Sequence, residues 1–263
     1  MSWADASDRV VLAAKIGLRE HLADNPLSVT LSTTWPRALL QCLFFTMLGR
    51  VIGGADGQAY TFVGSIAITI TLFTLVQICD VPMRDRWSST FYRIRSSEMP
   101  VPLVYAIRSW PLLVEGALVA VLCILLVGLF TVQFALMLQL LALVPIYLLL
   151  VLTSGAAGLT AASVALFGRA GNDVFVGNLG QYLIIAASGA LIPPGRVAWL
   201  DAIGSVLPMR HGLLAIRSNL AGEPWLAHLL CEVVVGLCWG LAAVLLYTYM
   251  ARRIRRNDHD KVT

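Results

Sequence analysis

The stretch GALVAVLCILLVGLFTVQFALMLQLLALVPIYLLLVLTSGAAGLTAASVALFG, residues 116–168, decides the fold class. It contains no Asp, Glu, Lys or Arg and exceeds two membrane spans of about 20 residues each. Only helices and closed barrels satisfy every backbone N–H and C=O group within a bilayer, and a continuous apolar run of this length is typical of helices. We therefore expect two spanning helices, near 111–130 and 135–165, separated by a turn near 131–133. The second contains three residues that bend helices, Pro145, Gly155 and Gly158.

The composition extends this interpretation to the whole chain of 263 residues. It is 58% hydrophobic and 13% charged, whereas soluble domains carry about 25% charged residues. Too few polar side chains remain to cover a water-facing surface, so lipid is the expected solvent. Further spans are predicted at 35–53, 57–79, 174–195 and 224–250, with a turn at 53–57 and a short loop at 169–173. The predicted fold class is an all-α integral membrane protein with six transmembrane helices in a single domain, residues 31–263.

Residues 1–30 are expected to form a cytoplasmic interface helix. Within 6–23, Val11, Leu18 and Leu22 share one face of a helix, while charged residues occupy other positions. The segment carries too many charges to span a bilayer, so we expect this amphipathic helix to lie along the membrane surface.

The basic residues predict the orientation. With both termini in the cytoplasm, fifteen of the 19 Lys and Arg residues lie inside and four outside, as expected from the excess of basic residues in cytoplasmic loops. The basic tail at 252–261 is interpreted as part of this signal, and no nucleic acid is expected as a partner. We expect a multi-pass protein of a bacterial plasma membrane.

No motif of the sequence is typical of an enzyme. The patterns GxxxxGK[ST], HExxH and GxSxG are absent, the four histidines are scattered, and none of the five cysteines forms a CxxC pair. We therefore expect no metal and no cofactor on this chain. Two acids, Glu115 and Glu232, lie inside predicted spans, where a carboxylate is costly and is a functional candidate. Wetting at the membrane interface, or pairing with an arginine, is the alternative for each.

Two segments between spans have unusual sequences. The loop 82–100 mixes charge with large aromatic side chains, which favours docking to a cytoplasmic partner or anchoring among lipid headgroups. Its candidate residues are Arg84, Asp85, Arg86, Trp87, Phe91, Tyr92 and Arg93. The segment 193–222 contains short apolar stretches broken by proline, which predicts a re-entrant helical hairpin between the fifth and sixth helices. A plain extracellular loop is the alternative.

Over nearly its whole length the chain resembles the membrane subunit, or permease, of ABC-2 type ABC transporters. The resemblance rests on the amphipathic start, the six spans, the Arg-rich loop after the second span, and the pattern SGxxxP…LPxxHGxxAIR at 188–217. This last pattern is more similar to the drug and natural-product exporter branch than to the polysaccharide branch. The resemblance implies that 83–95 is a coupling helix that docks on a separate ATPase, which would bind ATP and Mg²⁺. It also implies a re-entrant gate that includes Ser188, Gly189, Pro193, Pro208, His211 and Arg217.

The same resemblance implies half of a transporter. A second copy would complete it as a homodimer, or a related permease as a heterodimer, and the cargo would be an amphipathic drug, antibiotic or natural product. The implied path is lined by polar residues of the first, second and fifth spans, namely Gln41, Thr46, Thr69, Thr71, Thr74, Gln77, Asn178, Gln181 and Tyr182. Two alternatives remain: a permease for a lipid-linked polysaccharide, and a membrane scaffold protein that transports nothing.

Overall fold

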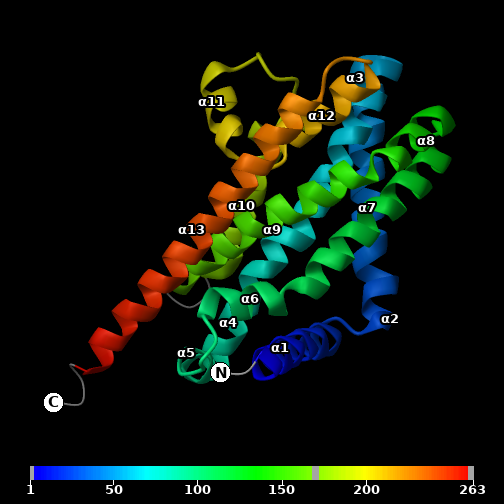
Figure 1. The fold of residues 1–263 in the computed structure, drawn as a ribbon. Helices are drawn as coiled ribbons and strands as arrows, with labels where there is room; N and C mark the ends of the chain where they lie inside the picture. The colour runs from blue at the N-terminus through cyan, green and yellow to red at the C-terminus, as the bar shows by residue number, and fades with distance from the viewer. Residues whose placement is uncertain (1–2, 168–171, 260–263) are drawn as a thin grey trace.

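The computed structural model describes residues 3–167 and 172–259, and all regular structure in these ranges is helical. Long helices form a bundle, while α1, Trp3–Asp24, lies across one end of it (Figure 1). The C-terminal end of α13, Leu226–His259, is at the same end as α1. The short helices α11, Ala198–Val206, and α12, Arg210–Leu220, lie at the opposite end. The helix predicted at 6–23 is present, and its position along a membrane surface stays a prediction.

The first helical run extends from Leu27 to Trp87 and contains two of the predicted spans. It consists of α2, Leu27–Val29, the π-helical turn Thr30–Thr34, α3, Trp35–Thr71, a second π-helical turn, Leu72–Val76, and α4, Gln77–Trp87. Within α3 the chain turns at Gly54, whose φ of 65° lies in the region that favours glycine. The turn predicted at 53–57 is therefore confirmed. The second half continues past the predicted end at residue 79, because Pro82 is accommodated inside α4.

The uncharged stretch forms α7, Trp110–Phe130, then α8, Phe134–Ala142, and α9, Val144–Phe167. The turn at 131–133 is as predicted, and the short helix α6, Val101–Arg108, precedes α7.

The predicted kinks are partly wrong. The helix breaks at Leu143, two residues before Pro145, because proline cannot donate to the preceding turn. Gly155 and Gly158 lie within continuous α9. A Cβ at Gly158 would stand 2.2 Å from the carbonyl oxygen of Thr74, so this glycine serves close helix packing rather than bending.

The fifth predicted span is shorter than expected. α10 runs from Asn172 to Ala187 and ends before the predicted limit at residue 195. The loop predicted at 169–173 falls largely on residues 168–171, which lie outside the described residues.

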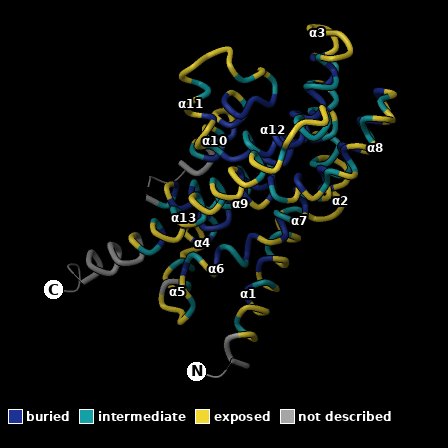
Figure 2. Tube along the Cα trace, turned by 45° about the horizontal axis from the view of Figure 1, so that its top comes forward, coloured by how far each residue is buried: buried dark blue, intermediate teal, exposed yellow. Residues whose placement is uncertain are grey.

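Four helical runs of the described residues are long and apolar enough to cross a membrane: Leu27–Trp87, Val101–Phe130, Val144–Leu166 and Leu226–Tyr249. The apolar helix Phe175–Ala187 is shorter. The buried core lies where α3, α7 and α9 meet, and exposed residues follow the outer side of α13 (Figure 2). Apolar residues dominate that exposed side, among them Leu230, Leu237 and Leu241. The fold is therefore that of a multi-pass membrane protein whose outer surface faces lipid.

Candidate functional site

The segment 82–100, predicted as a loop, begins inside a helix. α4 continues to Trp87, and Ser89, with a φ of 56°, reverses the chain before the short helix α5, Phe91–Arg95. The side chains of Trp87 and Tyr92 are each 57% exposed. The helix end and α5 therefore present two large aromatic rings at the end of the bundle where α1 lies.

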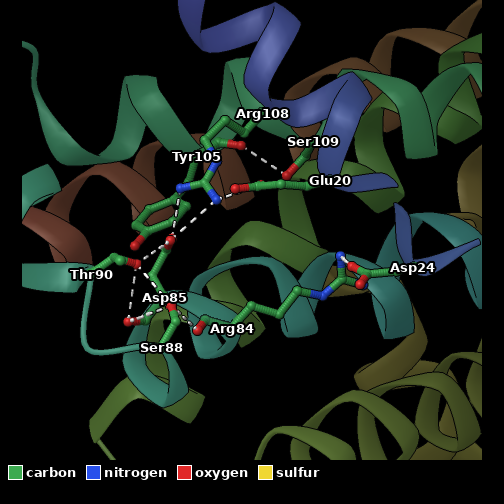
Figure 3. Close-up of polar contacts among 9 residues, drawn as sticks. All are labelled: Glu20, Asp24, Arg84, Asp85, Ser88, Thr90, Tyr105, Arg108 and Ser109. Carbon is green, nitrogen blue, oxygen red and sulfur yellow. Dashed lines mark hydrogen bonds and ion pairs between the residues drawn. The ribbon is translucent and has the colours of Figure 1, made fainter. Parts of the chain in front are cut away.

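Arg108, at the end of α6, joins three helices at this place (Figure 3). Its guanidinium donates to both carboxylate oxygens of Asp85 in α4, at 2.6 and 3.2 Å, and to Glu20 of α1 at 2.5 Å. Thr90 donates a further hydrogen bond to Asp85 at 3.1 Å, and the guanidinium lies 5.6 Å from the ring centre of Tyr105. Arg108 is only 5% exposed. A buried, two-pronged arginine–carboxylate pair fixes both position and orientation, so α1, α4 and α6 are held as one unit.

Two more ion pairs attach α1 to the same region. Arg84 of α4 pairs with Asp24 at the end of α1, and Arg9 pairs with Glu98 in the segment after α5. Both pairs are more exposed than the Arg108 cluster, so they contribute less to stability. Together with the Arg108–Glu20 pair, these two ion pairs fix α1 to the bundle from Arg9 to Asp24.

The predicted coupling residues therefore divide into two groups. Arg84 and Asp85 point toward α1 and α6 and hold the helices together (Figure 3). Arg86, Trp87, Tyr92 and Arg93 are exposed. The Tyr92 hydroxyl accepts a hydrogen bond from Arg93 Nε at 3.0 Å, which raises the pKa of the Arg93 guanidinium. Phe91 is half-buried against the apolar cluster that contains Tyr105.

Three residues of this cluster, Glu20, Asp24 and Arg108, were not singled out from the sequence. Glu20 and Asp24 are four positions apart and therefore share a face of α1. Two acids at this spacing on the N-terminal helix, together with an arginine just before the third predicted span, are the sequence signal that could have identified these three residues.

Glu115, one of the two acids inside predicted spans, lies where α1, α3 and α7 meet. One carboxylate oxygen accepts a hydrogen bond from Trp35 Nε1 at 3.1 Å, and the other lies 3.1 Å from His21 Nε2. Glu115 is 6% exposed. The alternative of an arginine partner is wrong for this residue among the described side chains, since its ionisable neighbour is a histidine.

Glu232, the second acid, is fully buried in α13 and closes the N-terminus of α12. It accepts hydrogen bonds from Met209 N at 2.9 Å, Gly212 N at 3.0 Å and the Thr153 hydroxyl at 2.7 Å. The first N–H groups of a helix lack partners within the helix, and a carboxylate there is favoured by the helix dipole. Glu232 thus has a structural role that sequence spacing did not reveal, because it lies far along the chain from α12.

Arg217 joins the residues after α10 to the second half of α3. It donates to the carbonyl oxygens of Gly189 at 2.8 Å and Ala190 at 3.2 Å, and its guanidinium lies 3.6 Å from the ring centre of Tyr60. Gly189 has a φ of 79°. Three of the predicted gate residues, Ser188, Gly189 and Arg217, therefore lie together.

The other predicted gate residues lie in different environments. Pro208 is buried just before α12, His211 Nε2 lies 3.0 Å from the carbonyl oxygen of Ser205, and Pro193 is exposed. Nearby, Arg210 and the Gly195 N–H bind the carboxylate of Asp201 and lower its pKa.

The predicted path residues are spread over several environments. Thr46, Thr69, Thr71, Thr74 and Gln181 are buried, Gln41, Gln77 and Asn178 are half-buried, and Tyr182 is exposed. The threonines use their hydroxyls within the bundle, as Thr74 does toward Ser154 at 2.8 Å. None of the nine lines the apolar cavity of about 230 Å³ between α9, α10 and α13.

Comparison with known proteins identifies the family. The family model for the ABC-2 type transporter matches residues 29–221, which include the coupling segment, the buried acid Glu115 and the residues around Arg217. Searches of the curated proteins and of the solved structures returned no significant match. A domain of this family is the permease component of an ABC transporter and is not itself catalytic, which implies ATPase subunits as partners. Since the match covers most of the chain, the protein belongs to the ABC-2 type transporter family.

Proposed function

We propose that the chain is one permease of an ABC exporter, and that it moves an amphipathic drug, antibiotic or natural product with energy from a separate ATPase. The observation that carries the proposal is the coupling surface, which we define as Arg86, Trp87, Tyr92 and Arg93. These side chains are exposed, yet the helix that bears two of them is held to α1 and α6 through the buried Asp85–Arg108 pair. A movement of the coupling surface would therefore be passed to the membrane helices through the rigid helix α4.

A groove beside the coupling surface supports docking of a partner. It encloses about 500 Å³ between α1 and the segment 93–99, and its walls include Leu12, Ile16, Ile94 and Met99. Aromatic and arginine side chains around an apolar groove are typical of protein interfaces. ATP and Mg²⁺ would bind to the ATPase docked there.

The proposed topology has six spans: the two halves of α3–α4 on either side of Gly54, then α7, α9, α10 and α13. Both termini are cytoplasmic in this scheme, and α11 and α12 form the re-entrant segment near the outer gate. Six spans form half a transporter, so a second copy or a related permease completes the path.

The cargo class follows from the sparse polar side chains of the proposed path. None of these nine side chains carries a charge. The hydroxyls of the buried Thr46, Thr69, Thr71 and Thr74 donate within the bundle, so a cargo would meet chiefly the amide and phenol groups of Gln41, Gln77, Asn178, Gln181 and Tyr182. Such a lining suits an amphipathic molecule with few hydrogen-bonding groups.

The test is copurification of the ATPase subunit and export of an amphipathic compound from cells. The double variant Trp87→Ala/Tyr92→Ala removes only exposed rings, so we expect a folded permease that has lost the ATPase and the export. Trp199→Ala is the matched control, because Trp199 is 66% exposed at the opposite end of the bundle.

Three results would contradict the proposal. A wild-type permease that binds no ATPase would instead indicate a scaffold. Loss of the ATPase in Trp199→Ala would show that ATPase binding does not depend specifically on the coupling surface. Export of a lipid-linked polysaccharide, with no amphipathic compound exported, would replace the cargo.

A further inference from the structure

A small pocket opens beside Glu115, where the N-terminal helix meets the first and third predicted spans. It encloses about 160 Å³, and its walls include Leu22, Trp35, Trp110, Val114 and Glu115. Tryptophan at the ends of membrane helices is typical of the boundary between headgroups and hydrocarbon. The pocket therefore has the composition of a site at the membrane surface.

The carboxyl group of Glu115 is incompletely satisfied in this pocket. Oε1 accepts a hydrogen bond from Trp35, but Oε2 is buried and no described residue donates a hydrogen bond to it. His21 Nε2 lies 3.1 Å from Oε2, at ion-pair distance, but it does not meet the geometry of a hydrogen bond. Among the described residues Glu115 has no Lys or Arg partner. A buried carboxylate oxygen that lacks a hydrogen-bond donor is costly. The imidazole of His21 lies at ion-pair distance without donating to Oε2, so this oxygen can still accept a hydrogen bond from a positively charged donor in the pocket.

The size of the pocket limits what can supply that donor. Sites for drug-sized molecules usually enclose about 300–1,000 Å³, so a cavity of about 160 Å³ holds only a headgroup. Beyond it, the exposed Val114, Leu118 and Leu125 follow one side of α7. An acyl chain would lie along that side while the headgroup occupies the pocket.

The structure assigns to this pocket a phospholipid with a primary amine, of the phosphatidylethanolamine class. Its ammonium donates to Glu115 Oε2, and the rings of Trp35 and Trp110 stand around it, where aromatic rings attract cations. A bound lipid would join α1 to α7 at a point that the Arg108 cluster does not reach. This assignment is independent of whether the chain exports anything.

The first experiment uses the wild-type full-length chain, so that no variant has to fold. Native mass spectrometry measures binding of phosphatidylethanolamine, its N,N-dimethyl derivative, phosphatidylcholine and phosphatidylglycerol, all with the same acyl chains. We expect the affinity to fall in the order of available N–H groups, so that phosphatidylethanolamine binds best and phosphatidylcholine about tenfold less, the equivalent of one charge-assisted hydrogen bond. Equal binding of all four lipids would overturn the assignment.

The second experiment tests the carboxyl group itself. In Glu115→Gln we expect the preference for phosphatidylethanolamine over phosphatidylcholine to disappear. In Glu223→Gln, which removes an exposed acid just before α13, we expect the preference to remain. A preference that persists in Glu115→Gln would place the lipid elsewhere.

A third experiment distinguishes a phospholipid from a soluble cationic amphiphile as the natural ligand of the pocket. Dodecylamine carries the same ammonium without the phosphate, and its displacement of phosphatidylethanolamine from the wild-type chain is expected if the ammonium is the recognised group. Binding of dodecylamine together with no binding of phosphatidylethanolamine would refute the lipid and indicate a soluble amphiphile instead.

Discussion

Replacing Arg108 by methionine removes the centre of the cluster that joins α1, α4 and α6. Methionine keeps the apolar stem, but the carboxylate of Asp85, whose side chain is 7% exposed, is then left with the hydrogen bond from Thr90 and no cation in place of Arg108 among the described residues. Leaving one charge of a buried pair without its partner destabilises by about 3–5 kcal/mol. The ion pair with Glu20 adds little, because that side chain is 38% exposed.

The double variant Arg108→Met/Asp85→Leu removes both charges but keeps apolar side chains in the space that the pair fills. Replacing both members of a buried pair by apolar side chains is often neutral or stabilising. Here Arg108 Nε is itself buried without a partner, so the native pair is not fully satisfied. We therefore expect the double variant to recover most of the stability that Arg108→Met loses.

Thermal unfolding in detergent, followed by intrinsic fluorescence, measures Arg108→Met, Asp85→Leu and the double variant. One kcal/mol shifts the melting temperature of a chain of 150–250 residues by about 2–4 °C, so Arg108→Met should melt roughly 10 °C below the wild type. Arg93→Met is the control, since this arginine is exposed and its loss should change stability by less than about 0.5 kcal/mol. A double variant as unstable as the sum of both single variants would refute the reasoning, because the two side chains would then act independently.

Three further predictions concern other parts of the chain. Glu232→Gln cannot satisfy all the N–H groups at the start of α12 and should destabilise by about 3 kcal/mol in the same melting assay; an unchanged melting temperature would contradict the capping role. Gly64→Ala should prevent normal folding, because its Cβ would lie 1.9 Å from the carbonyl oxygen of Ala190, whereas Gly240→Ala meets no atom within 4 Å and should be harmless; size-exclusion profiles of the two variants compare them. The partners of Asp201 lower its pKa, so their stabilising effect is present above the unfolded pKa of about 3.9 and is lost as the pH falls through the lower folded value. The melting-temperature difference between wild type and Asp201→Asn should therefore be constant from pH 7 to 5 and shrink below about pH 4, and a difference that grows in acid would contradict this sign.

Much of the helical layout follows from simple patterns in the sequence. The absence of charge over 116–168 and the turn residues at 131–133 predicted α7 and the α8–α9 pair. The glycine-rich turn near Gly54 and the amphipathic helix before Asn25 were also predictable, because both depend on local residue preferences.

What could not be predicted depends on contacts between distant residues. Glu232 was a functional candidate, with wetting or an arginine partner as the alternative, but it binds the start of α12, and no local pattern marks that contact. The early end of α10 has a similar cause, since Ala187 and Gly189 accept hydrogen bonds from Arg210 and Arg217 of α12. Sequence reasoning treats Gly158 as a bend, and only the neighbouring backbone at Thr74 explains why a glycine stands there.

The position of α1 also has a consequence for the order in which the protein is made. Glu20 meets Arg108, a residue 88 positions later in the chain. At synthesis rates of about 5–20 residues per second, the ribosome needs roughly 4–18 s to reach that arginine after it has added Glu20. During this interval the N-terminal helix has none of its native partners from α6 and α7, and its apolar face must rest on the membrane or on a chaperone. The helix at the start of the chain therefore reaches its final place only after α6 has been made.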